Sequence, residues 1–119
     1  DLIKSLLYKA PMDKFEALSE PTRRKILEML AREGRLSATQ ISERFAVSPS
    51  AISQHLKVLR EAKLVSMEKR AQQRIYGLNP DAMLEVEAWA RQLTQMWERR
   101  FDALDALLKA EQERIEKEH

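Results

Sequence analysis

Residues 37–59 of this 119-residue chain have the pattern of two short helices joined by a tight turn. Ser48 and Pro49 mark the start of the second helix, because serine accepts hydrogen bonds from free backbone amides and proline loses no hydrogen bond at the first helical position. At about 100° of rotation per residue, the apolar residues of this helix share one side and the polar residues share the other. The apolar side holds Ile52, Leu56 and Leu59, and the polar side holds Ser50, Ser53, Gln54 and Lys57. The pattern predicts a helix-turn-helix whose second helix has a free polar face.

The polar face of the second helix has side chains that are suited to reading DNA. Serine and glutamine both donate and accept hydrogen bonds, so Ser50, Ser53 and Gln54 are candidates for contacts with base edges, and a glutamine amide can bind adenine in a bidentate manner. Lys57 can reach a phosphate. A polar outer face is also what any surface helix shows, so a second observation is needed to favour DNA over simple solvation.

The charge of the chain supplies that observation. From Glu20 to Leu78 there are twelve Lys or Arg residues against six Asp or Glu residues, whereas residues 79–119 have six against ten. A basic surface is what binding to a polyanion requires. We therefore expect double-stranded DNA as the partner of this region. The candidates for phosphate contacts in the helix-turn-helix are Ser37, Thr39, Gln40, Ser48, His55 and Lys57.

Two helices are predicted before the helix-turn-helix. A short amphipathic helix over residues 1–10 follows from the spacing of Leu2, Ile3, Leu6 and Leu7, and Pro11 cannot comfortably continue it. A second helix starts near Pro21, turns Ile26, Leu27, Met29 and Leu30 inward and ends at Gly34. In the first helix of the helix-turn-helix, Ser37 and Gln40 have the spacing of a capping box, and we expect Ile41 and Phe45 to be buried.

A β-hairpin is predicted directly after the helix-turn-helix. The segments 64–69 and 74–78 alternate in part between apolar and polar residues and flank a polar tip. The polar side chains around the tip are Lys69, Arg70, Gln72, Gln73 and Arg74. In this position a basic hairpin is typical of a wing that lies along the DNA backbone or reaches the minor groove. An ordinary basic hairpin without a binding role is the alternative.

The last predicted helix runs from Pro80 to about Glu116 and would span more than about 50 Å, which is longer than a domain of this size needs for its own core. Its apolar stripe is broad and aromatic, and includes Val86, Trp89, Ala90, Leu93, Met96, Trp97, Phe101, Leu104, Leu107 and Leu108. We expect the N-terminal helix and a second copy of the chain to cover this stripe, which makes the protein a homodimer. A ligand pocket around Trp89, Met96 and Trp97 is the alternative.

Three segments resemble the ArsR/SmtB family of bacterial winged-helix repressors, namely residues 15–27, 50–65 and 74–78. The resemblance covers the chain from Phe15 to about Leu108. It implies a symmetric dimer, built from the first and last helices, that binds an inverted-repeat operator in a promoter and blocks transcription. One departure is Lys63, which stands where the family usually has glycine between the recognition helix and the wing.

Metal binding is not expected, although well-known members of this family sense metals. The chain has no cysteine, so a thiolate site is impossible, and its last helix has no histidine before His119 for the family's second type of site. The resemblance is therefore to the cysteine-free, non-metal-sensing type. An enzyme is also not expected, because the chain has no Gly-rich phosphate loop and only two glycines. We expect no cofactor.

These observations together predict one winged-helix DNA-binding domain over residues 1–119, mainly α-helical with a small β-hairpin wing. Residues 37–62 form the helix-turn-helix, residues 64–78 the wing, and residues 1–10 and 80–116 the dimerisation helices. No apolar run approaches the roughly 18 to 20 residues that cross a bilayer, and no secretory leader is visible, so we expect a soluble cytoplasmic protein. Two alternatives stay open: a winged-helix protein-interaction module, and a regulator that also binds an unknown small-molecule effector at the dimer interface.

Overall fold

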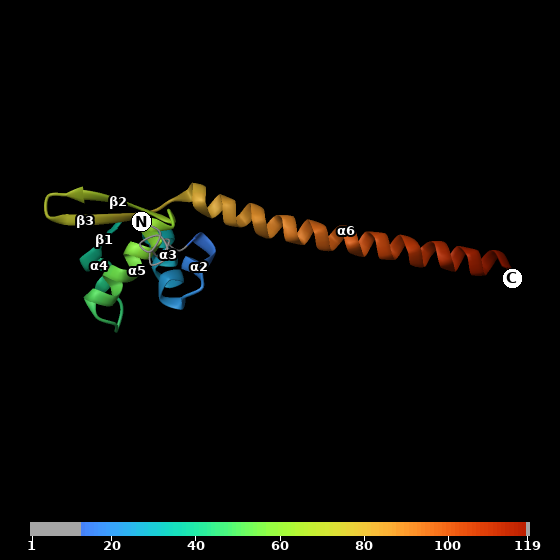
Figure 1. Cartoon of the computed structure of the whole chain (residues 1–119), viewed down its shortest axis with the longest axis horizontal. Helices are drawn as coiled ribbons and strands as arrows, with labels where there is room; N and C mark the ends of the chain where they lie inside the picture. Colours follow the sequence, from blue (N-terminus) through green and yellow to red (C-terminus); the bar gives the residue numbers. More distant parts are fainter. Residues whose placement is uncertain (1–12, 119) are drawn as a thin grey trace, which may run out of the picture. The chain divides into compact units, whose positions relative to one another are not determined.

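The computed structural model of the chain describes residues 13–118. The helices and strands in chain order are α2 (Lys14–Leu18), α3 (Pro21–Glu33), β1 (Leu36–Ser37), α4 (Ala38–Ser42), α5 (Pro49–Glu61), β2 (Val65–Arg70), β3 (Gln73–Leu78) and α6 (Pro80–Glu118) (Figure 1). One compact unit ends at Leu84, and a second starts at Glu85. The predicted fold class is confirmed. The helix predicted over residues 1–10, with Leu2, Ile3, Leu6 and Leu7, lies outside the described residues.

The ends of the helices are set by the residues that the sequence indicates. The Gln40 amide donates to Ser37 Oγ (3.1 Å) and the Ser37 amide donates to Gln40 Oε1 (2.8 Å), which completes the predicted capping box of α4. Ser48 caps α5 by accepting from the Ala51 amide (3.1 Å). Gly34 ends α3 with a φ of 83°, a conformation that glycine adopts without steric cost. These caps fix the lengths of the helices that surround the core.

Two features of this region differ from the prediction. The helix α4 ends at Ser42, so Phe45 follows it in the turn and is half-buried rather than part of the helix. The two-residue strand β1 was not predicted. It pairs antiparallel with β3, Leu36 opposite Tyr76, and the sheet order is β1-β3-β2. A strand of two residues has no periodicity of its own and is stabilised by its partner strand.

The hairpin has its predicted place, and its register is Val65 opposite Leu78 at one end and Arg70 opposite Gln73 at the other. The two residues between Arg70 and Gln73 form the turn, and Ala71 has a φ of 54°. Two-residue hairpin turns require a positive φ at their first residue, because only then does the turn match the twist of the strands. Figure 1 shows β2 and β3 extending side by side beyond the helices of the first unit.

The turn between α5 and β2 explains the departure at Lys63. The Leu64 amide donates to the Leu59 carbonyl and the Lys63 amide donates to the Arg60 carbonyl, both at 3.0 Å. This pair of hydrogen bonds defines a Schellman motif, in which the residue at the position of Lys63 is left-handed and usually glycine. Lys63 has a φ of 63°. The lysine thus keeps the geometry of the turn and bears its steric cost.

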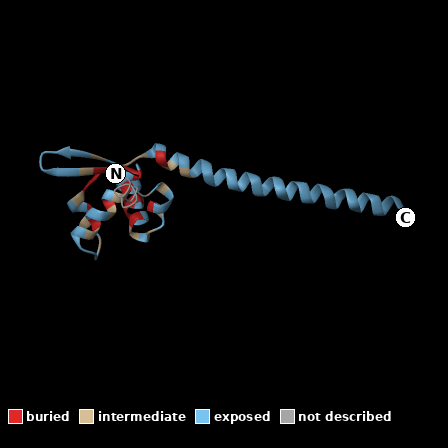
Figure 2. Cartoon of the chain, in the orientation of Figure 1, coloured by how far each residue is buried: buried red, intermediate tan, exposed pale blue. Residues whose placement is uncertain are grey.

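The core of the first unit is formed by apolar residues from α3, α4, α5 and the start of the sheet. The largest fully buried side chains are Ile26, Ile41, Ile52, Leu56, Leu59 and Leu64. Figure 2 shows that the buried residues gather in this unit. The predicted apolar side of the second helix of the motif is confirmed, and its burial leaves the opposite side of α5 exposed.

Candidate nucleic-acid interface

The polar face of α5 is exposed along its length. Ser50, Ser53, Gln54 and Lys57 are all exposed, whereas Ile52, Leu56 and Leu59 on the other side are buried. Pro49 at the first helical position and Ser48 before it start the helix, so the exposed side chains begin within its first turn. A helix with free donors and acceptors at its N-terminal end matches the way recognition helices meet base edges in the major groove.

The polar face of α5 and strand β3 share one hollow of about 560 Å³. Its lining residues are Ala38, Ser53, Gln54, Lys57, Arg60, Glu61, Arg74 and Tyr76. Three cations from two elements, Lys57, Arg60 and Arg74, therefore border the space next to Gln54. The predicted recognition helix and the predicted wing meet at this hollow. The sequence analysis missed Arg60, although its place three residues after Lys57 puts it on the same side of the helix.

The three predicted contacts in α4 are not equivalent. Ser37 is only 5% exposed, and its hydroxyl caps the helix. Gln40 is exposed, and its carbonyl oxygen accepts from the Ser37 amide, so its NH2 group is the end that can donate outward. Thr39 is exposed and borders a second hollow between α4 and α5, together with Ser53. Thr39 and Gln40 are thus better placed for a ligand than Ser37.

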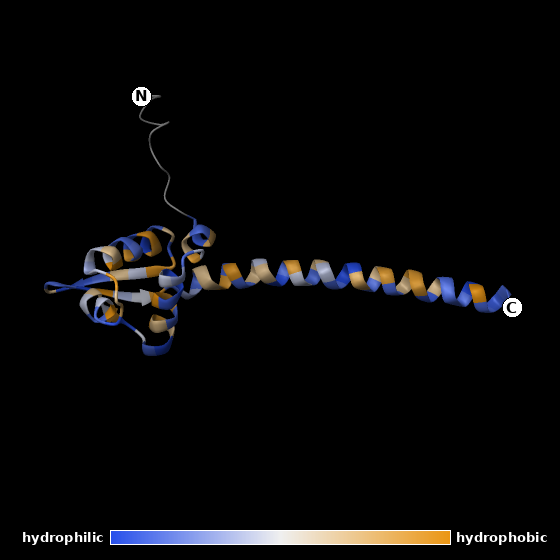
Figure 3. Ribbon diagram, turned by 90° about the horizontal axis from the view of Figure 1, so that it is seen from below, coloured by the Kyte–Doolittle hydropathy of each residue, from blue (hydrophilic) through white to orange (hydrophobic). Residues whose placement is uncertain are grey.

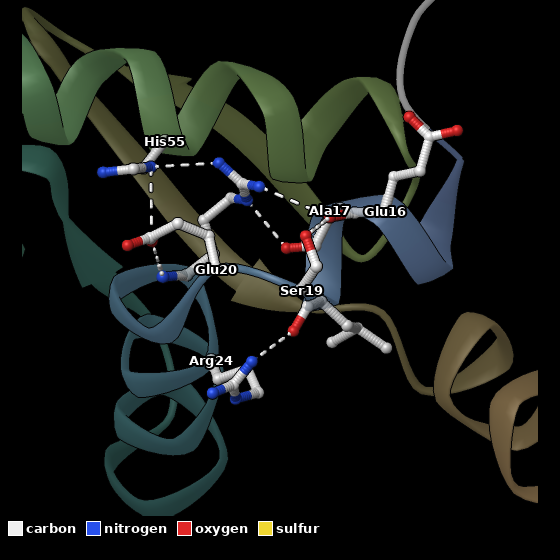
Figure 4. Close-up of polar contacts among 8 residues, drawn as sticks. Glu16, Ala17, Ser19, Glu20, Arg24 and His55 are labelled. Atoms are coloured by element: carbon white, nitrogen blue, oxygen red, sulfur yellow. Dashed lines mark hydrogen bonds and ion pairs between the residues drawn. The ribbon is translucent and has the colours of Figure 1, made fainter.

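His55 lies on the flank of α5 and faces α3 (Figure 4). Its Nδ1 is 3.3 Å from a guanidinium nitrogen of Arg23 and 3.8 Å from a carboxylate oxygen of Glu20. Since a guanidinium can only donate, Nδ1 accepts from Arg23 when the imidazole is neutral, whereas in a protonated imidazole the same atom faces the Glu20 carboxylate. The phosphate contact predicted for His55 thus stays a prediction for Nε2 alone.

Arg23 is buried and connects α2, α3 and α5. Besides its contact with His55, its Nε donates to the Ala17 carbonyl (2.7 Å) and a terminal nitrogen donates to the Glu16 carbonyl (3.4 Å). The carboxylate of Glu20 accepts from the Arg23 amide (3.0 Å). Desolvation raises the pKa of Glu20, but this hydrogen bond and the nearby His55 outweigh it and hold the pKa below its usual value. The sequence analysis did not single out Arg23, because nothing in its local pattern distinguishes a buried arginine from an exposed one.

The predicted wing residues are all exposed at the end of the hairpin. They are Lys69, Arg70, Gln72, Gln73 and Arg74. Lys69 and Arg74 are directly opposite each other on β2 and β3. Like charges at opposed positions destabilise a sheet, so this pair favours a bound anion. Glu68 pairs with Arg35 (3.0 Å) and with Arg70 (3.4 Å), which partly neutralises the base of the wing.

The apolar stripe of α6 is exposed in the single chain. Trp97 and Phe101 contact each other edge to face, with ring centroids 5.1 Å apart. A hollow of about 280 Å³ is lined by Trp97, Arg100, Phe101 and Leu104. It includes Trp97 but neither Trp89 nor Met96, so it differs from the ligand pocket considered as the alternative.

The described residues, 13–118, contain neither a candidate metal site nor a candidate membrane span. No group of three or more His, Cys, Asp or Glu side chains among them is arranged to hold a metal ion. Within the same range, no helix has the length and apolar character that crossing a membrane requires.

Comparisons with known proteins identify the family and agree with the fold. Residues 20–67 match the family described as bacterial regulatory protein, arsR family. The chain is 39% identical to the transcriptional repressor SdpR of Bacillus subtilis over 75 residues, which cover 63% of this chain and 82% of that protein. It is 37% identical to the HTH-type transcriptional regulator Rv2034 of Mycobacterium tuberculosis over 92 residues, which cover 73% of this chain and 85% of that protein. The solved structure of an ArsR-like transcriptional regulator from Rhodococcus sp. RHA1 matches with a TM-score of 0.68 and 30% identity, covering 78% of this chain and 87% of that one.

Proposed function

Because the chain belongs to the ArsR family of bacterial transcriptional regulators, which bind DNA and are not enzymes, we propose that it is a homodimeric repressor that reads an inverted-repeat operator. The observation that carries this proposal is the hollow lined by the polar face of α5 and by β3, where Lys57, Arg60 and Arg74 share the lining with Gln54 and Glu61. A glutamine amide beside three cations combines base recognition with phosphate binding. SdpR of Bacillus subtilis is a transcriptional repressor, which supports repression rather than activation.

The proposed roles follow from exposure and chemistry. Ser50, Ser53 and Gln54 contact base edges, because they are exposed on the first turns of α5 and can donate and accept. The remaining contacts hold phosphates. They come from Thr39, Gln40, Ser48, Lys57 and Arg60 in the helix-turn-helix, from Nε2 of His55, and from Lys69, Arg70, Gln72, Gln73 and Arg74 in the wing. Ser37 keeps a role in positioning α4, since its hydroxyl is the helix cap.

A dimer follows from the chemistry of α6. Large apolar side chains such as Trp97, Phe101 and Leu104 are more than half exposed in the single chain. Soluble proteins rarely leave an apolar surface of this extent in water. We infer that a second copy covers it, and that the two copies of α5 enter successive major grooves about 34 to 36 Å apart. A bacterial regulator of this kind acts in the cytoplasm, where the DNA is.

An effector site is not part of the proposal. The hollow beside Trp97 and Phe101 measures about 280 Å³ in the single chain. Ligand pockets usually measure about 300 to 1,000 Å³. A protein-interaction module is also disfavoured, because protein interfaces do not generally have the excess of Lys and Arg over Asp and Glu that residues 20–78 have.

Selection of bound fragments from a random DNA library tests the proposal most directly. We expect a palindromic sequence whose half-sites are one helical turn apart, and an affinity that falls steeply as salt concentration rises. A gel shift on the recovered sequence and on a scrambled duplex of the same composition then gives the specificity ratio. A protein that binds no duplex at low ionic strength, or that binds the recovered and scrambled duplexes equally, contradicts the proposal.

A further inference from the structure

Among the residues that the structure describes, Arg23 is the one charged residue that is buried. Hydrophilic residues are common on the helices of the first unit (Figure 3), yet every other Lys, Arg, Asp and Glu of the described residues is at least partly exposed. Burying a charge is unfavourable unless hydrogen bonds compensate it. The contacts of Arg23 therefore indicate what it does.

Two of these contacts anchor Arg23 to the backbone of α2 (Figure 4). Its Nε donates to the Ala17 carbonyl (2.7 Å), and its Nη2 donates to the Glu16 carbonyl (3.4 Å). Because a guanidinium is a rigid plane, these two bonds also fix the direction of the remaining nitrogen, Nη1. Nη1 lies 3.3 Å from Nδ1 of His55. The ring of His55 is thus held against a group whose own position is fixed.

His55 has one nitrogen that faces the interior and one that reaches solvent. Its Nε2 has no hydrogen-bond partner among the described residues, and no polar side-chain atom of those residues is buried without a partner. Figure 4 shows this second ring nitrogen pointing away from the contacts made by Nδ1. Since His55 directly follows Gln54, it borders the face of α5 to which the proposed function assigns base contacts. A flanking position of this kind suits a contact with a backbone phosphate.

The contacts of Nδ1 keep Nε2 a donor whether or not the ring is charged. In the neutral ring, Nδ1 accepts from Arg23, so the proton is on Nε2. In the charged ring both nitrogens have protons, and the Nδ1 proton faces the Glu20 carboxylate, 3.8 Å away. Phosphate oxygens only accept hydrogen bonds. An Nε2 that donates in both states therefore matches a phosphate in both states.

The charged neighbours of His55 come from α3 alone within the described part of the chain. Besides α3, the elements packed against α5 include α2, α4 and β2. The helix α4 has no titratable residue, and the charged residues of β2 are the three nearest the tip of the hairpin. On α2, neither Lys14 nor Glu16 contacts His55 through its charged group, and Figure 4 shows the Glu16 carboxylate pointing away. Arg23 thus disfavours a proton on Nδ1, and Glu20 favours one.

We propose that Arg23 and Glu20 are positioning residues for DNA binding, which hold the ring of His55 so that Nε2 always presents a proton to a backbone phosphate. The inference rests on the proposed function, which assigns that phosphate to His55. It adds that two residues away from the DNA set the strength of this contact, and that DNA affinity rises as pH falls through the range in which histidines titrate. The alternative is a cluster that only joins α2, α3 and α5 and does not act through His55.

A double-mutant cycle separates these two roles. Arg23→Met, His55→Ala and the double variant are compared by fluorescence anisotropy on a duplex of random sequence at low ionic strength, because a phosphate contact needs no operator. We expect His55→Ala to weaken binding about tenfold and Arg23→Met about threefold or more. In the His55→Ala background, Arg23→Met should change the affinity by less than about twofold. Arg24→Met is the matched control for the loss of one positive charge, since Arg24 is exposed and donates to the Leu18 carbonyl instead.

The pH profile of binding tests the role of Glu20. His119→Gln removes the other histidine of the chain, so the profile reports on His55. In that background we expect the affinity to rise at least about threefold from pH 8 to pH 6, because a phosphate favours the charged ring. Glu20→Gln keeps an acceptor for the Arg23 amide but removes the charge, and should reduce this rise by at least about half. His55→Ala should abolish it.

Circular dichroism and melting temperatures establish that each variant is folded under the conditions of the binding assay. Should Arg23→Met not fold, Arg23→Lys takes its place in the cycle, because one ammonium group keeps the charge but cannot reach Ala17 and His55 together. Equal losses for the Arg23 variant in both backgrounds, or a pH profile that Glu20→Gln leaves unchanged, overturn the inference and leave the proposed function standing. An unaltered protein that binds no duplex contradicts both.

Discussion

The residues before Glu85 bury most of their large apolar side chains within the chain, whereas α6 beyond Glu85 exposes most of its own. Leu56 in α5 is 1% exposed, and Leu104 in α6 is 53% exposed. Both are leucines on an amphipathic helix, so the residue type does not decide the outcome. What differs is whether the chain itself supplies a partner surface. The first unit is therefore expected to be stable in one copy, and the second only in two.

The largest expected effect is a change in the free energy of unfolding, and it distinguishes Leu56 from Leu104. Leu56→Ala leaves a cavity in a closed core and should lower the free energy of unfolding by about 2 to 5 kcal/mol. Leu104→Ala should leave the unfolding of the first unit unchanged and raise the dimer dissociation constant. Urea denaturation followed by far-UV circular dichroism measures the first effect, and sedimentation equilibrium measures the second. Equal losses of unfolding free energy in the two variants would show that α6 folds as part of the first unit's core.

The next effect concerns DNA binding, which the proposed function assigns to residues of the first unit. Gln54→Ala should weaken binding to the selected operator by about 1 to 3 kcal/mol and leave binding to scrambled DNA unchanged. Lys57→Ala should weaken binding to both and reduce the salt slope by about one. Fluorescence anisotropy at several salt concentrations distinguishes the two. Equal losses on both duplexes for Gln54→Ala would remove it from the base-reading role.

Two adjacent arginines test how far burial strengthens a polar contact in the first unit. Arg23 is buried and donates to the Ala17 carbonyl, whereas Arg24 is exposed and donates to the Leu18 carbonyl, both at 2.7 Å. Arg23→Ala leaves buried acceptors unpaired and should cost about 1 to 3 kcal/mol, whereas water replaces the exposed donor in Arg24→Ala at a cost of less than about 0.5 kcal/mol. Thermal denaturation of both variants compares them. Similar melting temperatures would mean that water replaces Arg23 as well.

Local signals in the sequence were sufficient to predict most helices and strands of the first unit. Ser48, Pro49 and Gly34 determine helix ends through their own backbone chemistry, and the structure confirms all three. The features that the sequence did not predict are those in which the structure or contacts of a residue depend on a partner far away in the sequence. The strand β1 exists only through β3, and the contact of His55 with Arg23 joins residues 32 positions apart. Arg60 shares the hollow with Arg74 only because the sheet brings β3 beside α5. The covering of α6 by a second copy, which the sequence predicts, stays a prediction, since it depends on another molecule.

The smallest expected effect tests whether the unfolding free energy of the first unit can change without any change in the dimer dissociation constant. Lys63 is left-handed at the end of α5, where a non-glycine residue costs about 1 to 2 kcal/mol. Lys63→Gly removes that cost, but glycine also has more freedom in the unfolded chain, so we expect a net gain of about 0.5 to 1 kcal/mol in unfolding free energy. Lys63→Ala removes the charge and keeps the strain, which makes it the matched control and should give no gain. Because the turn belongs to the first unit and the apolar stripe of α6 beyond Glu85 to the second, the dimer dissociation constant should be the same for all three proteins. If Lys63→Gly strengthened the dimer as well as the fold, the two regions would share their stability, and the division at Glu85 would describe the geometry of the chain but not its energetics.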